Sequence, residues 1–499
     1  MATPHYDLII IGAGLSGIGS ACRVAQTYPN KTLAILERRE SIGGTWDLFR
    51  YPGIRSDSDM ASFGYNFKPW YSDRVLAKGT DIRHYVEETA REFHLQDKVH
   101  YGLKITGADW SDADQQWTVT ALHEKTGDTR RFTCGFLLNC AGYYNYDHGY
   151  RPTFEGEENF KGTLIHPQFW PEDLDYEGKK VVVIGSGATA ITVVPAMAEK
   201  AGHVTMLQRS PSYIMAMPDT DKISMALNKV LPKKLVFTLA RKRNILFQRG
   251  LYLASMRWPN AMRRFMLSHM RKQAGPDIDP RHLTPSYNPW EQRLCAAPDG
   301  DFFKALRSGK ADMVTDHIDH LTETGIVLTS GQTLEADIIV AATGLDVQLM
   351  GGLALQLNGE PVDLTRKLTY KGILLQDVPN YAWIFGYTNA PWTLKCDIGG
   401  RYLCRLFEQM DARGAAAVRP VDMDGLESDG GMLDGFAPGY IMRAKDRMPR
   451  QGLRGPWKVT MHYGKDKKML VDDPVDDGIL QFEAPTAVAG ERPPMAATA

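Results

Sequence analysis

The first forty residues alternate between apolar runs and a helical pattern. Residues 8–11 form a continuous apolar run, residues 12–17 form a glycine-containing turn, and apolar residues then recur at helical spacing to about Thr27. A second apolar run at 32–36 leads into Glu37. Such short, continuous apolar runs are typical of parallel strands covered on both faces. The pattern therefore predicts a strand–turn–helix–strand unit.

The same order of elements recurs about 170 residues later. A strand is expected at 180–184, a turn at 185–190, a helix at 191–200 and a second strand at 204–207. Pro195 falls inside this helix and should kink it, because proline removes a backbone donor. The repeat predicts two α/β domains of one kind.

The segment from Lys222 to Lys272 has a different character. It holds thirteen Lys and Arg residues and no Asp or Glu, with apolar residues interleaved at helical spacing. We interpret it as a helical subdomain inserted at about 220–280. A basic amphipathic helix can lie on an anionic membrane or steer an anionic cofactor. A solvated helical excursion without a partner remains the alternative.

The length of 499 residues predicts more than one domain. We expect an α/β fold with two Rossmann-like dinucleotide-binding domains and the helical insertion. A strand-like segment at 336–344 should return the chain to a Rossmann-type edge. We expect residues 1–150 to form the first part of one domain and residues 336–485 to form its second part. Residues 151–335 should form the second domain with its insertion. Residues 486–499, which are rich in Ala and Pro, should form a disordered tail.

Composition narrows the functional classes. A formal net charge of -1 argues against a dedicated nucleic-acid binder. We find neither a signal peptide nor an uncharged apolar stretch of membrane-spanning length, so we expect a cytoplasmic protein. Peripheral membrane contact through 222–272 stays open. The sequence does not indicate an oligomeric state.

The six cysteines are scattered and show neither CxxC nor zinc-ligand spacing. We therefore expect free thiols and no metal site. A flavin disulfide reductase would need a close redox-active cysteine pair, and none follows the first turn.

The first turn carries glycines at positions 12, 14 and 17. Gly12 permits the tight turn, Gly14 lets a pyrophosphate approach the backbone, and Gly17 lets helix and strand pack closely. The helix that follows offers free N–H groups to phosphates. Glu37 stands twenty residues after Gly17, where a carboxylate can accept hydrogen bonds from ribose hydroxyls. We predict a dinucleotide site here.

The second turn carries Gly185, Gly187 and Ala190, a permitted variant of the same pattern. Arg209 closes its second strand, where an acid would favour NADH. A guanidinium can pair with a 2′-phosphate. The second site therefore favours NADPH, although Arg209 as a plain surface charge is the alternative.

Two longer motifs narrow the family. Residues 160–171 match FxGxxxHxxxWP, and residues 43–57 match GGxWxxxxYPGxxxD. With these, the chain resembles the Baeyer–Villiger flavin monooxygenases, which are two-dinucleotide-binding flavoproteins. The stretches 44–59 and 287–295 are most similar to the subgroup of actinobacterial ethionamide-activating monooxygenases.

The resemblance implies an activity. NADPH would reduce FAD, and O2 would form a C4a-peroxyflavin that inserts one oxygen atom into a ketone to give an ester or lactone. Oxidation of sulfides or thioamides at sulfur is expected as a side activity. Arg293 would stabilise the anionic peroxide, Asp57 would hold that arginine, and His166 would couple the movements of the two domains.

The resemblance also implies cofactor contacts. FAD is expected to contact Gly12, Gly14, Ser16, Gly17, Glu37, Thr45, Trp46, Asp47, Leu48, Asp57 and Ile105. NADPH is expected to contact Arg55, Ser56, Gly185, Ser186, Gly187, Ala188, Thr189, Ala190, Gln208 and Arg209. Many family members carry Lys before the catalytic Arg, whereas Gln292 stands here, which leaves the strictness of the NADPH preference open.

Two other functions remain. The chain could be an N- or S-oxidising flavin monooxygenase without ketone chemistry, although the pair Trp170-Pro171 speaks against it. It could also be a non-catalytic flavoprotein that senses NADPH or docks on a membrane. Asp57 and Arg293 speak against this third interpretation.

Overall fold

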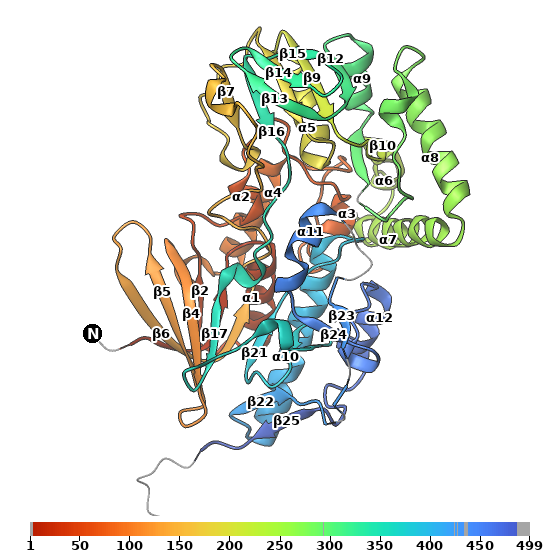
Figure 1. Ribbon diagram of the computed structural model, residues 1–499. Coiled ribbons are helices and arrows are strands. Elements are labelled where there is room, and N and C mark those ends of the chain that lie inside the picture. Colours follow the sequence, from red (N-terminus) through yellow and green to blue (C-terminus); the bar gives the residue numbers. More distant parts are fainter. Residues whose placement is uncertain (1–2, 293, 424, 427, 434–437, 487–499) are drawn as a thin grey trace, which may run out of the picture.

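The computed structural model describes residues 3–292, 294–423, 425–426, 428–433 and 438–486. Two α/β units lie one above the other in Figure 1, and green helices project at their side. The expected tail at 486–499 lies, apart from Thr486, outside the described residues.

The lower unit is built on one large sheet with the strand order β18-β17-β4-β5-β6-β1-β2-β3. Its parallel part places β1 between β2 and β6, and the core residue Ile9 pairs with Ala34 on one side and Leu137 on the other. The two long helices α1 and α10 pack together against this sheet. The bounds are β1 (His5–Ile11), β2 (Leu33–Leu36), β3 (Val99–His100), β4 (Leu103–Ser111), β5 (Gln116–His123), β6 (Thr129–Asn139), β17 (Ala354–Leu357), β18 (Glu360–Pro361), β21 (Tyr381–Trp383), α1 (Leu15–Thr27), α4 (Gly79–Glu92) and α10 (Trp392–Arg413).

The upper unit has a parallel sheet with the order β12-β9-β8-β16-β7. Its strands are β7 (Thr163–Ile165), β8 (Lys180–Ile184), β9 (His203–Gln208), β12 (Ala311–Thr315) and β16 (Ile338–Ala341), and helices α5 (Ala188–Met197) and α9 (Asp301–Arg307) pack against each other beside it. The α5 helix continues for two residues past Pro195.

One expected boundary is displaced. We placed 336–485 in the second part of the first domain, but β16 pairs with β8 and β7 inside the upper sheet. Its four residues are all buried there, which is why this apolar strand completes the upper unit before the chain returns. The change of sheet therefore falls after Ala341 rather than at residue 336.

The helical insertion is confirmed. It consists of α6 (Lys222–Leu227), α7 (Lys233–Arg257) and α8 (Pro259–Ala274). A buried arginine fastens it to the lower unit: Arg241 Nη1 donates to the carbonyl oxygens of Ala61, Ser62 and Gly64, at 3.0, 3.0 and 2.7 Å. These carbonyls end the short helix α3 (Met60–Phe63), whose C-terminus favours a positive charge.

The remaining elements include small sheets, short helices and the strands β19 and β20, which join the large sheet through β21. They are α2 (Thr45–Leu48), β10 (Ile214–Met217), β11 (Cys295–Pro298), β13 (Ile318–Thr322), β14 (Gly325–Leu328), β15 (Thr333–Glu335), β19 (Thr369–Tyr370), β20 (Leu374–Leu375), β22 (Ala417–Pro420), β23 (Ser428–Gly431), α11 (Gly439–Ala444), β24 (Arg450–Gly452), α12 (Tyr463–Lys467) and β25 (Leu480–Glu483). Within the described residues, no helix is both long enough and apolar enough to span a bilayer.

Candidate active site

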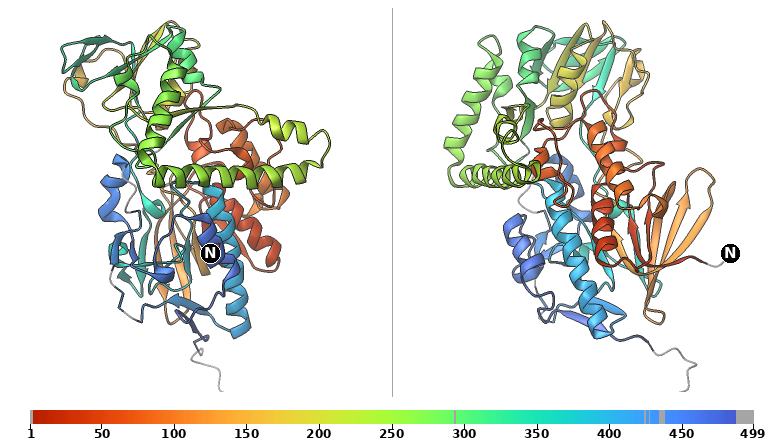
Figure 2. Two further views of the ribbon diagram at one scale, coloured as in Figure 1. Left: turned by 90° about the vertical axis from the view of Figure 1, so that its right-hand side faces the viewer. Right: turned by 180° about the vertical axis from the view of Figure 1, so that it is seen from behind.

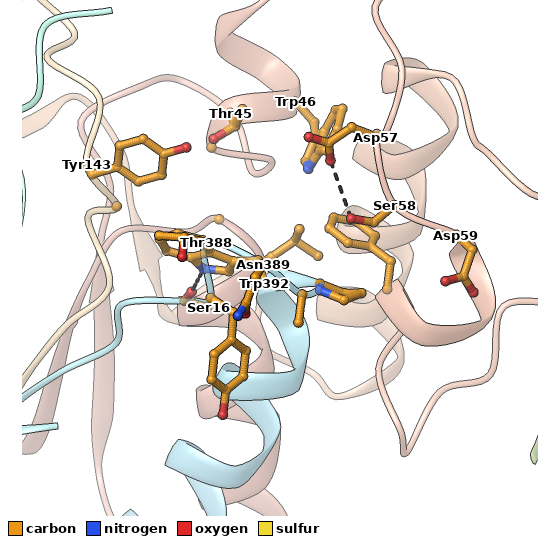
Figure 3. A pocket seen from close by; sticks show the side chains of 18 of the residues that line it. Ser16, Thr45, Trp46, Asp57, Ser58, Asp59, Tyr143, Thr388, Asn389 and Trp392 are labelled. Carbon is orange, nitrogen blue, oxygen red and sulfur yellow. Dashed lines mark hydrogen bonds between the residues drawn. The ribbon is translucent and has the colours of Figure 1, made fainter. Parts of the chain in front are cut away.

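A cavity of about 1470 Å³ opens between the lower unit and the helical insertion. It is larger than the typical ligand pocket of about 300–1,000 Å³, so it has room for a dinucleotide and a second molecule. Figure 3 shows part of its wall, with Thr45, Trp46 and Asp57 facing Tyr143 and Trp392 across the open space.

The first glycine-rich turn forms one end of this cavity. Gly12 has φ of 97°, and a Cβ there would lie 2.8 Å from the carbonyl oxygen of Cys140. A Cβ on Gly17 would overlap the carbonyl oxygen of Gly12. Helix α1 begins directly after Gly14 and has no side-chain cap at its start, and Gly14, Leu15 and Ser16 line the cavity. The turn fits a pyrophosphate bound at a helix N-terminus.

Glu37 is fully buried at the end of β2 and lines the cavity. Its Oε2 accepts the N–H of Ala13 at 2.7 Å, and its Oε1 accepts the N–H of Arg39 at 2.8 Å. Burial raises the pKa of this carboxyl against the opposing effect of those two bonds. Glu37 therefore braces the turn, and a carboxylate has lone pairs left for a ribose hydroxyl.

The other residues predicted to contact FAD divide into two groups. Ser16, Thr45, Trp46 and Ile105 line the cavity. Ser16 is held in place by Trp392, whose Nε1 donates to its Oγ at 2.8 Å.

Asp47 and Leu48 are buried behind the cavity wall. The carboxylate of Asp47 pairs with Arg39 at 2.5 Å, Arg50 at 3.0 Å and Arg83 at 3.4 Å. Burial opposes its charge, but bonds such as that from Arg39 outweigh this, so the pKa of Asp47 is lowered. Its observed role is to fasten the 45–48 helix from behind.

Asp57 stands where two cavities meet. It lines the large cavity and also a smaller one of about 140 Å³. Its Oδ1 accepts a 3.4 Å bond from Ser58 Oγ, drawn in Figure 3. Arg293, the expected partner of Asp57, lies outside the described residues. Trp290 and Leu294, which flank it in the sequence, line the large cavity.

The small cavity gathers several residues predicted to contact NADPH. Arg55, Ser56, Ala188 and Thr189 line it together with His166. Arg55 and Ser56, which precede Asp57 in the sequence, already have partners within the protein. Arg55 pairs with Asp301 at 2.5 Å, and the buried Ser56 Oγ accepts the N–H of Ala77 at 3.1 Å.

His166 joins the outgoing and returning connections between the units. Its Nδ1 accepts the N–H of Gln168 at 3.2 Å, so Nε2 carries the proton and donates to the carbonyl oxygen of Gly344 at 3.0 Å. Burial lowers the pKa of the ring. A Cβ on Gly149 would overlap the imidazole, so only glycine lets the chain pass this close. The imidazole is a neutral bridge with both nitrogens engaged.

The second glycine-rich turn leads into α5 as expected. Ser186 Oγ donates to the carbonyl oxygen of Ser210 at 2.8 Å, and the position of a Cβ on Gly187 is open. Arg209 is exposed just after β9. Gln208 differs from our expectation, because it is 1% exposed and its Nε2 donates to His282 O and Thr315 Oγ1. Both hydrogen bonds of that amide nitrogen are therefore made to acceptors within the protein.

Sequence reasoning missed Tyr143 and Tyr144 in the wall opposite the first turn. Tyr143 stacks on Trp392 at a ring distance of 5.3 Å and on Tyr144 at 4.6 Å. Tyr387, which also lines the cavity, donates to the buried Asp466 at 2.9 Å, and Asp466 pairs with Lys395 at 2.8 Å. Aromatic residues that follow a strand such as β6 are common, so their presence in the sequence is only weak evidence that they line a cavity.

Comparison with known proteins places this site in a family. Residues 6–267 match the family described as flavin-binding monooxygenase-like. A Mycobacterium tuberculosis protein named as an FAD-containing monooxygenase, MymA, is 56% identical over 484 residues, which are 96% of this chain and 98% of that protein. The FAD-containing monooxygenase EthA of the same species is 47% identical over 490 residues, which are 98% of this chain and 100% of EthA.

The fold has a solved counterpart. A steroid monooxygenase bound to NADP has a TM-score of 0.78 at 22% identity, and the match covers 96% of this chain and 100% of that one. The predicted fold class is thereby confirmed, and so is the resemblance to flavin monooxygenases. With a family match over more than half of its length and relatives along nearly all of it, the chain belongs to the flavin-binding monooxygenase-like family.

Proposed function

We propose that this chain is an FAD-containing, NADPH-dependent Baeyer–Villiger monooxygenase, which inserts one oxygen atom of O2 into ketones to give esters or lactones. One observation carries the proposal. The large cavity runs from the first turn to Asp57, and the small cavity runs from Asp57 to His166 and the second turn. Two nucleotide sites, one in each cavity, would thus converge on one carboxylate.

The first turn would hold FAD. Gly12 and Gly17 permit the tight turn, because a Cβ on either would meet backbone oxygen, and the uncapped start of α1 would offer its N–H groups to the pyrophosphate. Glu37 would accept a ribose hydroxyl, while Ser16, Thr45 and the ring of Trp46 would contact the remainder. FAD, once bound, would supply the chemistry that accepts electrons from NADPH and activates O2.

The second turn and the exposed Arg209 would hold NADPH. Because Gln208 is turned inward, the 2′-phosphate preference would depend on Arg209. Arg209→Gln should raise KM for NADPH about tenfold, as expected for one charge-assisted hydrogen bond, and leave KM for NADH unchanged. Equal effects on both cofactors would remove Arg209 from this role.

Three side chains would act near the reacting atoms or position those that do. Arg293 would stabilise negative charge, because a guanidinium stays protonated at any working pH. Asp57 would orient that guanidinium. His166 would keep the two connections together while the units adjust to the cofactor.

Ketones with apolar substituents fit the wall opposite the first turn. Tyr143 and Trp392 form a stacked aromatic face, and Leu251 and Phe247 of α7 add aliphatic and aromatic surface. The same apolar surface would take sulfides or thioamides, whose sulfur could accept the oxygen atom as a side reaction.

The test is product analysis. Purified holoenzyme with NADPH, O2 and a panel of ketones and sulfides should give esters or lactones, with smaller amounts of sulfoxides. Arg293→Ala should abolish ester formation and retain flavin reduction by NADPH, and Arg293→Lys should recover only part of the ester. Sulfoxide without any ester would instead indicate an N- or S-oxidising monooxygenase. NADPH oxidation no faster than background would leave only a non-catalytic flavoprotein.

A further inference from the structure

The helical insertion turns an unusual amount of apolar surface outward. Among the described residues, sixteen large apolar side chains are strongly exposed, and eleven of them lie between 222 and 274. The eleven are Ile223, Met225, Val230, Leu235, Leu239, Leu246, Phe247, Leu253, Met256, Trp258 and Phe265. A solvated excursion would not need this concentration, since soluble surfaces rarely gather apolar side chains in one place.

On α7 these side chains form one stripe with cations among them. The stripe runs Leu235, Leu239, Lys242, Leu246, Arg249, Leu253 and Met256, at alternating steps of four and three residues. Such spacing keeps all seven on one side of a helix.

The other side of α7 faces the lower unit. Val236 and Phe237 are buried there, and Asn244 and Gln248 each donate to Asp59 at 2.7 Å. Helix α7 lies across the face that the left view of Figure 2 turns toward the reader, so its outward stripe is on the surface of the molecule.

The same face carries many positive charges that form no ion pairs with carboxylates in the described part of the chain. Of the thirteen cations in this segment, Arg241, Arg243 and Arg263 bond to atoms of the protein. The other ten are exposed, and within the described part of the chain none of them forms an ion pair with a carboxylate: Lys222, Lys229, Lys233, Lys234, Lys242, Arg249, Arg257, Arg264, Arg271 and Lys272. No Asp or Glu occurs from 222 to 276.

We propose that this outward face, formed by α6, α7 and α8, docks on the surface of an anionic lipid bilayer. Apolar side chains would enter the boundary between head groups and acyl chains, and the interleaved Lys and Arg would meet lipid phosphates. Trp258, exposed where α7 meets α8, has the amphipathic ring that favours this boundary. A second copy of the chain fits poorly, because two such faces would bring like charges together.

The active-site cavity opens on this docking face. Ile223 of α6 lines the cavity, yet its side chain is 59% exposed. The mouth of the cavity would therefore meet the bilayer, and an apolar molecule could pass from the lipid into the cavity without crossing water. Resting on the proposed function, this means that the enzyme would draw apolar ketones from the bilayer rather than from water.

Docking is tested with FAD-loaded protein and sedimenting vesicles. Wild type should bind phosphatidylglycerol/phosphatidylcholine vesicles and bind pure phosphatidylcholine weakly. The triple variant Lys233→Glu, Lys234→Glu, Lys242→Glu should lose on the order of 100-fold in partitioning. Its matched control, Lys179→Glu, Lys200→Glu, Lys310→Glu, changes the net charge equally on exposed sites of the upper unit and should bind like wild type. A second triple, Leu239→Ser, Leu246→Ser, Leu253→Ser, should lose about tenfold or more.

Three results would overturn docking. One is no preference of wild type for anionic vesicles. Another is an equal loss of vesicle binding in the Lys233/Lys234/Lys242 triple and in its Lys179/Lys200/Lys310 control. The third is an oligomer, seen by light scattering, that the Leu→Ser triple dissolves while vesicle binding is absent, since the face would then belong to a second copy.

Substrate delivery needs a separate measurement. The Lys233/Lys234/Lys242 triple should lower kcat/KM about tenfold for 2-dodecanone presented in anionic vesicles and leave that for 2-butanone in buffer unchanged, because none of its positions lines the cavity. Unchanged kcat/KM for both would refute delivery from the bilayer. If wild type oxidises neither ketone but binds vesicles as described, the proposed function fails and docking stands.

Discussion

Single residues set the backbone geometry of both nucleotide turns, and the two turns should respond differently to one added methyl group. Gly12→Ala would place a Cβ 2.8 Å from the Cys140 carbonyl oxygen in a left-handed conformation, so the turn must shift. We expect this variant to purify without flavin.

In Gly187→Ala the new Cβ would meet no atom within 4 Å. The fold and the FAD content should stay unchanged. KM for NADPH should rise on the order of tenfold, since the methyl group would hold the pyrophosphate away from the N–H groups of the turn. Flavin content by absorbance and steady-state kinetics check both variants. Loss of flavin from Gly187→Ala would show that the turns are assigned to the wrong cofactors.

His166 should contribute a pH dependence to stability. Burial lowers its pKa, so the folded protein favours the neutral ring, whereas the unfolded chain takes up a proton near its ordinary value of about 6.5. The contribution is complete above that pH and is lost progressively as pH falls below it. His166→Gln keeps an amide donor for Gly344 and cannot titrate.

The measurement is Tm between pH 5 and 8. The decline of Tm on the acid side should be shallower in His166→Gln than in wild type. His84→Gln, on the exposed side of α4, is the matched control and should follow wild type. Parallel curves for His166→Gln and wild type would mean that this imidazole is not a source of acid sensitivity.

At the scale of elements, helix α7 depends on one buried charge. Arg241→Ala would leave the carbonyls of Ala61, Ser62 and Gly64 without their donor, which should cost about 1–3 kcal/mol of unfolding free energy. Hydrogen–deuterium exchange should accelerate across 233–257. The adjacent and exposed Lys242→Ala should change neither quantity. Equal protection of α7 in Arg241→Ala and wild type would show that its other contacts are sufficient.

Local pattern predicted the elements that continuous apolar runs and glycine turns define. Helix α1 was expected to end at about Thr27 and ends there, and β8 covers the expected 180–184. These elements were readable because strand, turn and helix follow each other within thirty residues. Pairing between distant segments gave no such signal. The sheet to which β16 belongs is decided by its packing against β8, some 150 residues earlier in the chain.

Contacts between distant segments were equally hard to predict in the candidate site. Glu37 and Asp57 line the cavity as expected, because their place after a strand or within a motif fixes their position. The inward orientation of Gln208 could not be predicted, since a residue at the end of a strand can face either way and its acceptors come from His282 and Thr315. The pair Lys395–Asp466, which supports Tyr387, joins segments about seventy residues apart and could not be seen in the sequence.

At the scale of the whole molecule, the two cavities differ too much in size to serve two dinucleotides in one arrangement. The small cavity beside the second turn holds only about 140 Å³, well below the roughly 300 Å³ at which ligand pockets begin. We therefore expect NADP⁺ to bind only when the upper unit moves relative to the lower one. The two connections joined by His166 and Gly344 would be the hinge of this movement.

This movement can be measured with one spin label on each unit. All six native cysteines are buried, and burial raises the pKa of thiols such as Cys22 and Cys396 to about 12, so they should resist labelling. Exposed sites for new cysteines are Lys125→Cys in the lower unit and Lys310→Cys in the upper one. The distance distribution between the labels should shift when NADP⁺ is added to the FAD-loaded protein, and Gly149→Ala, which crowds the His166 ring, should reduce the shift. Saturation with NADP⁺ at an unchanged distance would mean that the second nucleotide binds without opening the units, and the small cavity would then not be its entrance.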